Sequence, residues 1–300
     1  MCHQDQEMRL RLLILNLLAL ALLPAFSQRK RAFMVGVSHY DTALTGYQWN
    51  NINGTNDISL LSPILREQGF QITSLLDEQA TYNAITKQLQ QFIQKSRAGD
   101  IIYLHFSTHG QPVEDISGDE ADGWDEAIVP VDAYKLYRKG VYEGERHLLD
   151  DQLNTYLQKL RSKLGPKGMV YVVIDACHAG TASRGNDDII RGTHVGFTPH
   201  NKIFKPSKEQ RSHFPLVHKN KLADIVFLEA CRADQLNTEI KVEGQRYGAL
   251  SYHLAQTLQS VTLSTQPDTF TEKLQQTIVQ QGRWPNNQNL VIETSIHKWL

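Results

Sequence analysis

The sequence predicts an α/β fold, with a mostly parallel central sheet and helices on both of its faces. Two observations favour it: short apolar runs typical of buried strands, and stretches with helical apolar spacing between those runs. A parallel sheet covered by helices buries its strands on both faces, so its strands read as continuous apolar runs. The expected strands are residues 32–37, 70–76, 100–106, 169–174 and 225–228, with a last short one at 290–293.

The expected helices alternate with these strands along the chain. The clearest is residues 81–96, where Ile85, Leu89 and Phe92 recur on one face. Residues 41–56 are rich in Asn, Gly and Thr, which predicts a loop. The other expected helices are 57–68, 150–164, 247–259 and 270–281.

Composition limits the class of protein. The 300 residues are 41% hydrophobic and 21% charged, which suits a globular domain with its own core. A net charge of -1 argues against a general nucleic-acid binder, which needs a basic surface. We expect one domain over residues 28–300.

The first 27 residues predict a signal peptide. Arg9 and Arg11 precede an apolar run at 12–23, and Ala25 and Ser27 are small residues suited to cleavage. An uncleaved membrane anchor is the alternative, although the run is shorter than the roughly 20 residues that a span needs. We therefore expect an exported protein with no stable membrane span after cleavage.

Removal of residues 1–27 would leave two cysteines, Cys177 and Cys231. Two cysteines do not make a disulfide scaffold, so the core must hold the domain together. A single bridge between them is an alternative, and it would abolish thiol chemistry.

The ends of two expected strands carry a histidine and a cysteine. His109 follows the strand at 100–106, Cys177 follows the strand at 169–174, and we place both on flexible turns that contain glycine. Ligands in such folds bind outside the carboxyl ends of the strands. A thiolate beside an imidazole is an activated nucleophile, and the N–H groups near Cys177 and Gly110 could stabilise an oxyanion. The alternative is a buried structural thiol and an ordinary loop histidine.

These segments resemble the caspase/metacaspase clan of cysteine peptidases. HFSTHGQ is similar to the segment around the family histidine, and VVIDACHAG to the segment around its cysteine. Residues 115–134 resemble the metacaspase acidic loop, with Ser117 as a departure. Further similar segments are NNINGTNDISLLSPILREQGF, HLLDDQLNTYL, FLEACRADQLNTE and YGALSYHL, so the resemblance runs from about residue 31 to 258.

The resemblance implies cleavage of polypeptides after Arg or Lys, with Cys177 as nucleophile and His109 as base. The matching substrate-pocket positions are Asp57, Ser107 and Asp175, whose carboxylates would pair with a basic side chain. An N-cap is the alternative role for Asp57. The chemistry requires no cofactor.

The resemblance also implies a possible calcium site. Its matching positions are Asp125, Asp150 and Asp151, and clustered carboxylates suit calcium. Arg184 stands where the family has a further Asp, which is a departure. The alternative is a solvated acidic loop with Asp151 as a helix cap.

The segment at 181–222 is long and basic, and it separates two expected strands. An enzyme specific for Arg or Lys would recognise such a segment, which predicts a self-cleavage linker. The alternative is a solvated basic loop. Beyond it, we expect Cys231 to be a small buried residue, and the resemblance implies that Asp234 and Gln235 help to line the pocket.

Three functions are therefore open. The first is a cysteine endopeptidase that acts through an acyl-enzyme. Activation by calcium and self-processing are further expected properties of this enzyme. The second is a catalytically silent binding protein with the same fold. The third is a calcium-responsive interaction module built around the acidic loop.

Overall fold

The computed structural model describes residues 28–40, 49–118, 120, 122–177, 188–205 and 220–296. The expected signal peptide at 1–27 lies outside these residues, as do Arg184 and the rest of 178–187 and 206–219. Within the described ranges, no helix is both long and apolar enough to cross a membrane.

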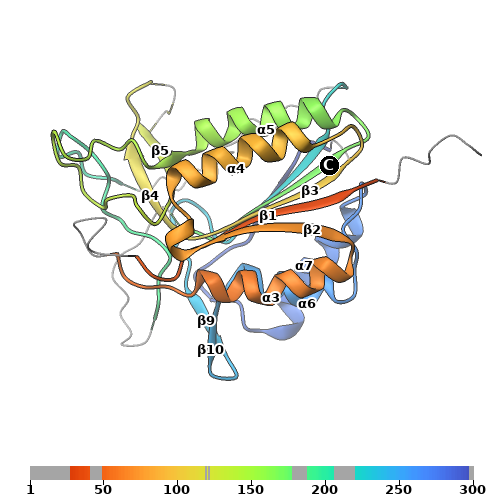
Figure 1. The fold of residues 1–300 in the computed structure, drawn as a ribbon. Helices are drawn as coiled ribbons and strands as arrows, with labels where there is room; N and C mark the ends of the chain where they lie inside the picture. Colours follow the sequence, from red (N-terminus) through yellow and green to blue (C-terminus); the bar gives the residue numbers. More distant parts are fainter. Residues whose placement is uncertain are drawn as a thin grey trace, which may run out of the picture.

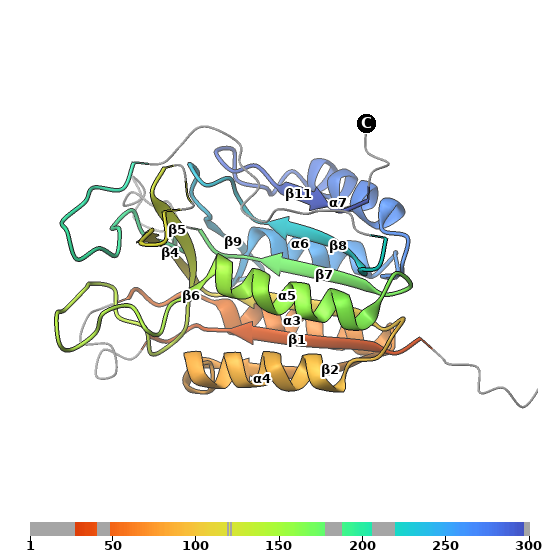
Figure 2. The ribbon, with the colours of Figure 1, turned by 90° about the horizontal axis from the view of Figure 1, so that it is seen from above.

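A six-stranded sheet forms the centre of the molecule, in the order β11-β8-β7-β3-β1-β2 (Figure 2). All neighbouring strands are parallel except the pair of β11 and β8. This confirms the expected mostly parallel sheet. The strands are β1 (Lys30–Gly36), β2 (Phe70–Leu76), β3 (Ile101–Ser107), β7 (Met169–Ile174), β8 (Asp224–Glu229) and β11 (Val291–Thr294).

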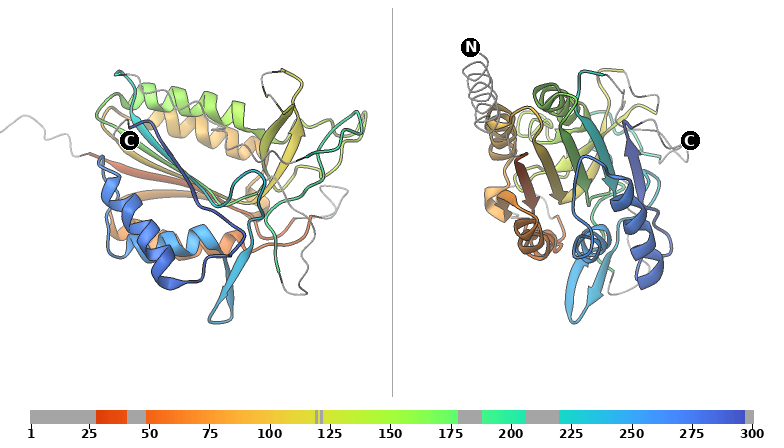
Figure 3. Two further views of the ribbon diagram at one scale, coloured as in Figure 1. Left: turned by 180° about the vertical axis from the view of Figure 1, so that it is seen from behind. Right: turned by 90° about the vertical axis from the view of Figure 1, so that its right-hand side faces the viewer.

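Helices cover both faces of this sheet, as expected (Figures 1 and 3). On one face lie α4 (Tyr82–Lys95) and α5 (Asp150–Leu164); on the other lie α3 (Gly54–Glu67), α6 (Ala249–Leu258) and α7 (Asp268–Gln281). The start of α4 is fixed by Thr81, whose side chain accepts the backbone N–H of Ala84 at 3.2 Å. A short 3-10 helix, η1 (Asp77–Gln79), joins β2 to α4.

Each face of the sheet has its own hydrophobic core because successive strand residues point to opposite sides. In β1, Phe33 and Val35 pack into the cluster beneath α4 and α5. Ala32 and Met34, their neighbours, pack into the cluster beneath α3, α6 and α7. Both cores hold the parallel strands rigidly and so fix where the strand ends lie.

Two antiparallel units near the carboxyl ends of the strands were not predicted. One is a three-stranded sheet of β4 (His109–Glu114), β5 (Trp124–Val129) and β6 (Leu148–Leu149). The other is a hairpin of β9 (Glu239–Val242) and β10 (Gln245–Gly248), which projects from the domain in Figure 1. Their strands are short and lack continuous apolar runs, which is why the sequence pattern missed them.

Candidate active site

His109 and Cys177 come from neighbouring strands of the sheet. The last paired residues of β3 and β7 are Phe106 and Ile174, and each functional residue follows three positions later. Both are buried, with exposures of 2% and 1%. The expectation of two flexible turns was wrong for His109, because it is the first residue of β4 and pairs with Val129.

The imidazole of His109 is held from several sides. Its Nε2 lies 2.7 Å from the carbonyl oxygen of Asn50, and a carbonyl only accepts, so Nε2 carries the proton. Trp49 stacks on the ring with centroids 5.0 Å apart, and the hydroxyl of Tyr40 accepts the His109 backbone N–H at 2.9 Å. Nδ1 is buried with no hydrogen-bond partner among the described residues. Burial lowers the pKa of His109 to about 3, so the ring is neutral and Nδ1 is unprotonated.

Cys177 is a free thiol in a small sulfur-containing cluster. Its Sγ donates to the backbone carbonyl of Gln235 at 2.7 Å, and it packs beside Cys231. Both cysteines are free, so the alternative of a disulfide between them is wrong. A hydrogen bond with Cys177, and then burial, raise the pKa of Cys231, which keeps it a buried neutral thiol as expected.

Two residues of the segment after β8, Asp234 and Gln235, were expected to line the pocket. Gln235 contacts the cysteine cluster through its backbone carbonyl, the acceptor for Cys177. Asp234 lies 3.8 Å from Arg232 in an ion pair, and its place in the pocket stays a prediction.

The chain itself runs through this site at Arg191 and Gly192. Gly192 forms parallel bridges with both Gly110 and Cys177. The carbonyl oxygen of Arg191 accepts the N–H of Cys177 at 2.9 Å and that of Gly110 at 3.2 Å. These two N–H groups were expected to stabilise an oxyanion, and here they both point at the carbonyl of the Arg191–Gly192 peptide bond.

Only glycine fits at position 192. A Cβ added there would lie 2.0 Å from the carbonyl oxygen of Cys177 and 3.1 Å from its Cβ. Such an atom would push this segment away from the cysteine. The close approach of the two backbones therefore depends on Gly192.

The side chain of Arg191 fills the pocket formed by the three predicted residues. Its Nη1 donates to Asp57 Oδ2 and to Ser107 Oγ, each at 2.6 Å, and lies 3.6 Å from Asp175 Oδ1. Arg191 is fully buried. The alternative of a solvated basic loop at 181–222 is therefore wrong for this residue, whose charge is neutralised inside the protein.

A third carboxylate in the pocket, Glu239, was missed by the sequence analysis. Its Oε1 accepts from Nε and Nη2 of Arg191 at 3.1 and 3.0 Å. Asn53 anchors it by donating its backbone N–H to Oε1 and its Nδ2 to Oε2, both at 2.6 Å. Glu239 stands in the quoted segment FLEACRADQLNTE, but no periodicity there shows which of its polar side chains turns inward.

Asp57 is a pocket residue and not a helix cap. Asn53 occupies the N-cap position of α3, and Asp57 lies in the first turn with no exposed surface. Its Oδ2 accepts from Ser107 at 2.5 Å and its Oδ1 from the N–H of Gly248 at 3.0 Å. Burial is the largest influence and raises the pKa of Asp57 to about 6, against the lowering effect of Arg191.

Asp175 is satisfied on both carboxylate oxygens. Oδ1 accepts from Asn237 Nδ2 at 2.7 Å, and Oδ2 accepts from the N–H and Oγ of Ser251 at 2.8 and 2.6 Å. Burial alone would raise the pKa of Asp175, but Arg191 and these donors lower it overall. A charged Asp175 therefore remains in the pocket beside Arg191.

The model of the Caspase domain family of C14 peptidases matches residues 29–291. The chain belongs to this family. That places it among cysteine-type peptidases, which are hydrolases that act on polypeptides. Caspase-domain peptidases need no cofactor for their chemistry.

Curated relatives of this caspase domain are metacaspases of fungi. Metacaspase-1B of Aspergillus terreus is 25% identical over 78% of this chain and 68% of its own length. Metacaspase-1B of Aspergillus fumigatus is 26% identical over 78% of the chain and 63% of its own length. Metacaspase-1 of Scheffersomyces stipitis is 25% identical over 77% of the chain and 63% of its own length. The chain thus spans about two thirds of the length of these relatives.

Solved structures share the fold at lower identity. A Geobacter sulfurreducens protein aligns with a TM-score of 0.61 and 21% identity, covering 89% of this chain and 93% of that protein. The structure of pro-sf-caspase-1 aligns with a TM-score of 0.50 and 14% identity, covering 89% and 88% of the two chains. These likenesses establish the caspase fold.

The three aspartates expected to bind calcium lie on adjoining elements of the caspase domain. Asp125 is in β5, and Asp150 and Asp151 begin α5 directly after β6, which pairs with β5 at Ala127 and Leu149. Asp125 and Asp150 are buried, whereas Asp151 is exposed. Over the part of the chain that the structure describes, no group of three or more His, Cys, Asp or Glu residues is arranged to hold a metal ion. Calcium binding by these three aspartates therefore stays a prediction.

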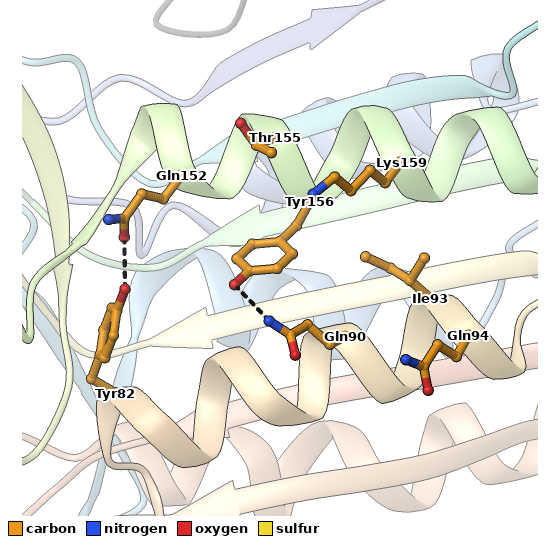
Figure 4. A pocket seen from close by; sticks show the side chains of 8 residues that line it. All are labelled: Tyr82, Gln90, Ile93, Gln94, Gln152, Thr155, Tyr156 and Lys159. Carbon is orange, nitrogen blue, oxygen red and sulfur yellow. Dashed lines mark hydrogen bonds between the residues drawn. The ribbon is translucent and has the colours of Figure 1, made fainter.

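A separate groove of about 450 Å³ lies between α4 and α5 (Figure 4). Tyr82 and Gln90 from α4 face Gln152 and Tyr156 from α5 across it, and side chains of the two helices hydrogen-bond over the gap. None of its lining residues belongs to the site around Arg191. This groove is therefore separate from the candidate site at the strand ends.

Proposed function

We propose that this protein is a cysteine endopeptidase that cleaves after basic residues, with Cys177 as nucleophile and His109 as general base. The observation that carries the proposal is the position of Arg191. Its side chain occupies the acidic pocket, while its carbonyl oxygen accepts from the N–H groups of Cys177 and Gly110. An arginine on the amino side of a cleaved bond, the P1 residue, would bind in this way.

The proposed reaction proceeds through an acyl-enzyme. Nδ1 of His109 takes the proton of the Cys177 thiol, and the sulfur attacks the P1 carbonyl carbon. The negative charge that develops on the carbonyl oxygen is stabilised by the Cys177 and Gly110 N–H groups. The intermediate expels the amine, which takes the proton from His109. A water molecule, deprotonated by His109, then attacks the thioester, which expels the Cys177 thiolate and releases the acid; His109 returns its proton to the thiolate.

The pocket supports a basic P1 residue and opposes an acidic one. Asp57, Asp175 and Glu239 all contact the single guanidinium of Arg191. A P1 aspartate would place a fourth carboxylate among these three, away from water and without a cation. Buried like charges at such distances cost far more than an exposed pair.

The Arg191–Gly192 bond is the proposed first substrate of the enzyme. This narrows the predicted self-cleavage linker at 181–222 to one peptide bond. Support comes from the contacts of Gly192 with both Gly110 and Cys177, which hold this bond between the segments that carry the two catalytic groups. Until this bond is cut, or the segment leaves the site, Arg191 blocks the pocket to other substrates.

Export and calcium activation remain predictions. Export depends on the signal peptide at 1–27, and a shorter secreted form beginning near residue 28 would support it. Calcium activation depends on Asp125, Asp150 and Asp151. A chelator titration tests it directly, because activity that is unchanged by chelation would contradict calcium activation.

Peptides that differ only at P1 test the proposed function. The parent protein should cleave peptides with Arg at P1, leave those with Asp intact, and lose all activity in the Cys177→Ala variant. Preferential cleavage after Asp would contradict the assigned pocket. If no peptide is cut and a basic peptide electrophile does not label Cys177, the protein is instead a silent member of the fold.

A further inference from the structure

We propose that Glu239 makes the pocket select arginine over lysine at P1, an inference that rests on the proposed peptidase function. Asp57, Ser107 and Asp175 explain why a positive charge is bound, but any cation satisfies them. Glu239 contacts a part of the arginine side chain that lysine does not possess.

The guanidinium of Arg191 is held on two separate sides. On one side, Nη1 donates to Asp57 and Ser107. On the other, Nε and Nη2 donate together to Oε1 of Glu239, at 3.1 and 3.0 Å. The planar fork of arginine matches this arrangement, because it carries donors that point in different directions from one rigid group.

A lysine has one ammonium nitrogen at the end of a flexible chain. Placed beside Asp57 and Ser107, that nitrogen would have to leave the Nε and Nη2 positions empty. The carboxylate of Glu239 would then lose both donors from the substrate while remaining in a pocket that excludes water. The loss falls on a buried acceptor and is therefore more costly than at the surface.

Asn53 prevents the carboxylate of Glu239 from shifting toward a P1 side chain that does not reach it. It donates to both carboxylate oxygens at 2.6 Å, and Glu239 is only 5% exposed. The anchor comes from the N-cap of α3, the helix that also carries Asp57. Asn53 is thus a positioning residue that acts through Glu239, and the two sides of the pocket are fixed relative to each other.

The test compares paired peptides with Arg or Lys at P1, using one preparation of each variant. The ratio of the two kcat/KM values does not depend on the fraction of active enzyme. In the parent, Arg should be preferred, and Glu239→Gln should lower the Arg/Lys ratio by about tenfold to a hundredfold. Glu243→Gln is the matched control, since Glu243 is exposed at the turn of the same hairpin and the ratio should not change.

The internal bond gives a second measurement that needs no added substrate. Arg191→Lys should slow self-cleavage in the parent, and the difference between Arg and Lys at 191 should shrink in the Glu239→Gln background. Asn53→Ala, which keeps the charge of Glu239 but removes the side-chain donor to its Oε2, should lower the peptide ratio in the same direction. Asn53→Ala therefore tests the role of Glu239 even if the Glu239→Gln variant does not fold.

Two results would contradict two different claims, the role of Glu239 and the peptidase function. An Arg/Lys ratio unchanged by Glu239→Gln or Asn53→Ala, with both peptides still cleaved, would overturn the role of Glu239 and leave the peptidase intact. A parent protein that cleaves neither peptide would refute the proposed function itself, and this inference with it.

Discussion

The backbone N–H of Cys177 donates to the carbonyl oxygen of Arg191 at 2.9 Å. The proposed nucleophile is therefore in register with the peptide bond that follows the arginine in its pocket. Two parts of the chain that are separated in sequence by the whole 178–190 segment meet through this contact. It links the proposed specificity pocket to the proposed site of chemistry.

His109 should contribute to the chemical step far more than to substrate binding. We expect His109→Asn to lower kcat for a P1-Arg peptide by about a hundredfold to ten-thousandfold, the usual contribution of a general base, with a small change in KM. Steady-state kinetics measure both. His200→Asn is the control because His200 is an exposed histidine, and it should leave kcat near that of the parent. Equal losses in both variants would argue against a special role for His109.

Cleavage after Arg should weaken as the pH falls through about 6. Burial raises the pKa of Asp57 to about 6, so its carboxylate is charged above this pH and neutral below it. A neutral Asp57 cannot pair with the P1 guanidinium, so kcat/KM falls on the acid side. His109 does not contribute to this limb, because its pKa is lowered to about 3.

The pH profile of kcat/KM measures this effect, with Asp57→Asn as the comparison. That variant should be at least about tenfold less active at neutral pH and should lack the acid limb near pH 6. An identical limb in Asp57→Asn would assign the titration to another group.

Gly192→Ala should release the internal segment from the site. The added Cβ would meet the carbonyl oxygen of Cys177 at 2.0 Å, so the Arg191–Gly192 bond must move. A displacement of about 1 Å can cost a factor of about a hundred, so self-cleavage should slow by about that much. Labelling of Cys177 by a basic peptide electrophile should become faster, since Arg191 no longer holds the pocket. Slower labelling than in the parent would contradict this account.

The two halves produced by self-cleavage should stay together. The cut would fall between β7 and β8, which are adjacent strands paired from Met169–Asp224 to Ile174–Glu229. A single peak in size-exclusion chromatography, with two bands on a denaturing gel, is the expected result. Separation of the fragments without denaturant would mean that the sheet does not hold them.

The central sheet was predictable because strands that are buried on both faces appear in the sequence as continuous apolar runs. The run at 169–174 is apolar throughout and the run at 100–106 is mostly apolar, and amphipathic helices separate the strands. The antiparallel strands β4 and β5 have no such continuous apolar run. β4 reads His-Gly-Gln-Pro-Val-Glu, whose polar residues suggest a turn, and its burial depends on the segments that pack around it.

The pocket was predictable only in part, and the reason is distance along the chain. Asp57, Ser107 and Asp175 match positions in familiar motifs. Arg191 and Glu239 do not stand out, since one is a basic residue in a basic segment and the other is the first residue of a hairpin strand. Their pairing at 3.0 Å depends on the path of the chain between β7 and β9, which no local pattern encodes.

Sequencing the new amino terminus of the self-cleaved protein tests the central claim most directly. The account predicts a fragment that begins Gly192-Thr193-His194 in the parent and is absent from Cys177→Ala. A Cys177→Ala preparation that yields the same fragment, or a parent that cleaves peptides after Arg yet cuts itself only at other bonds, would contradict it.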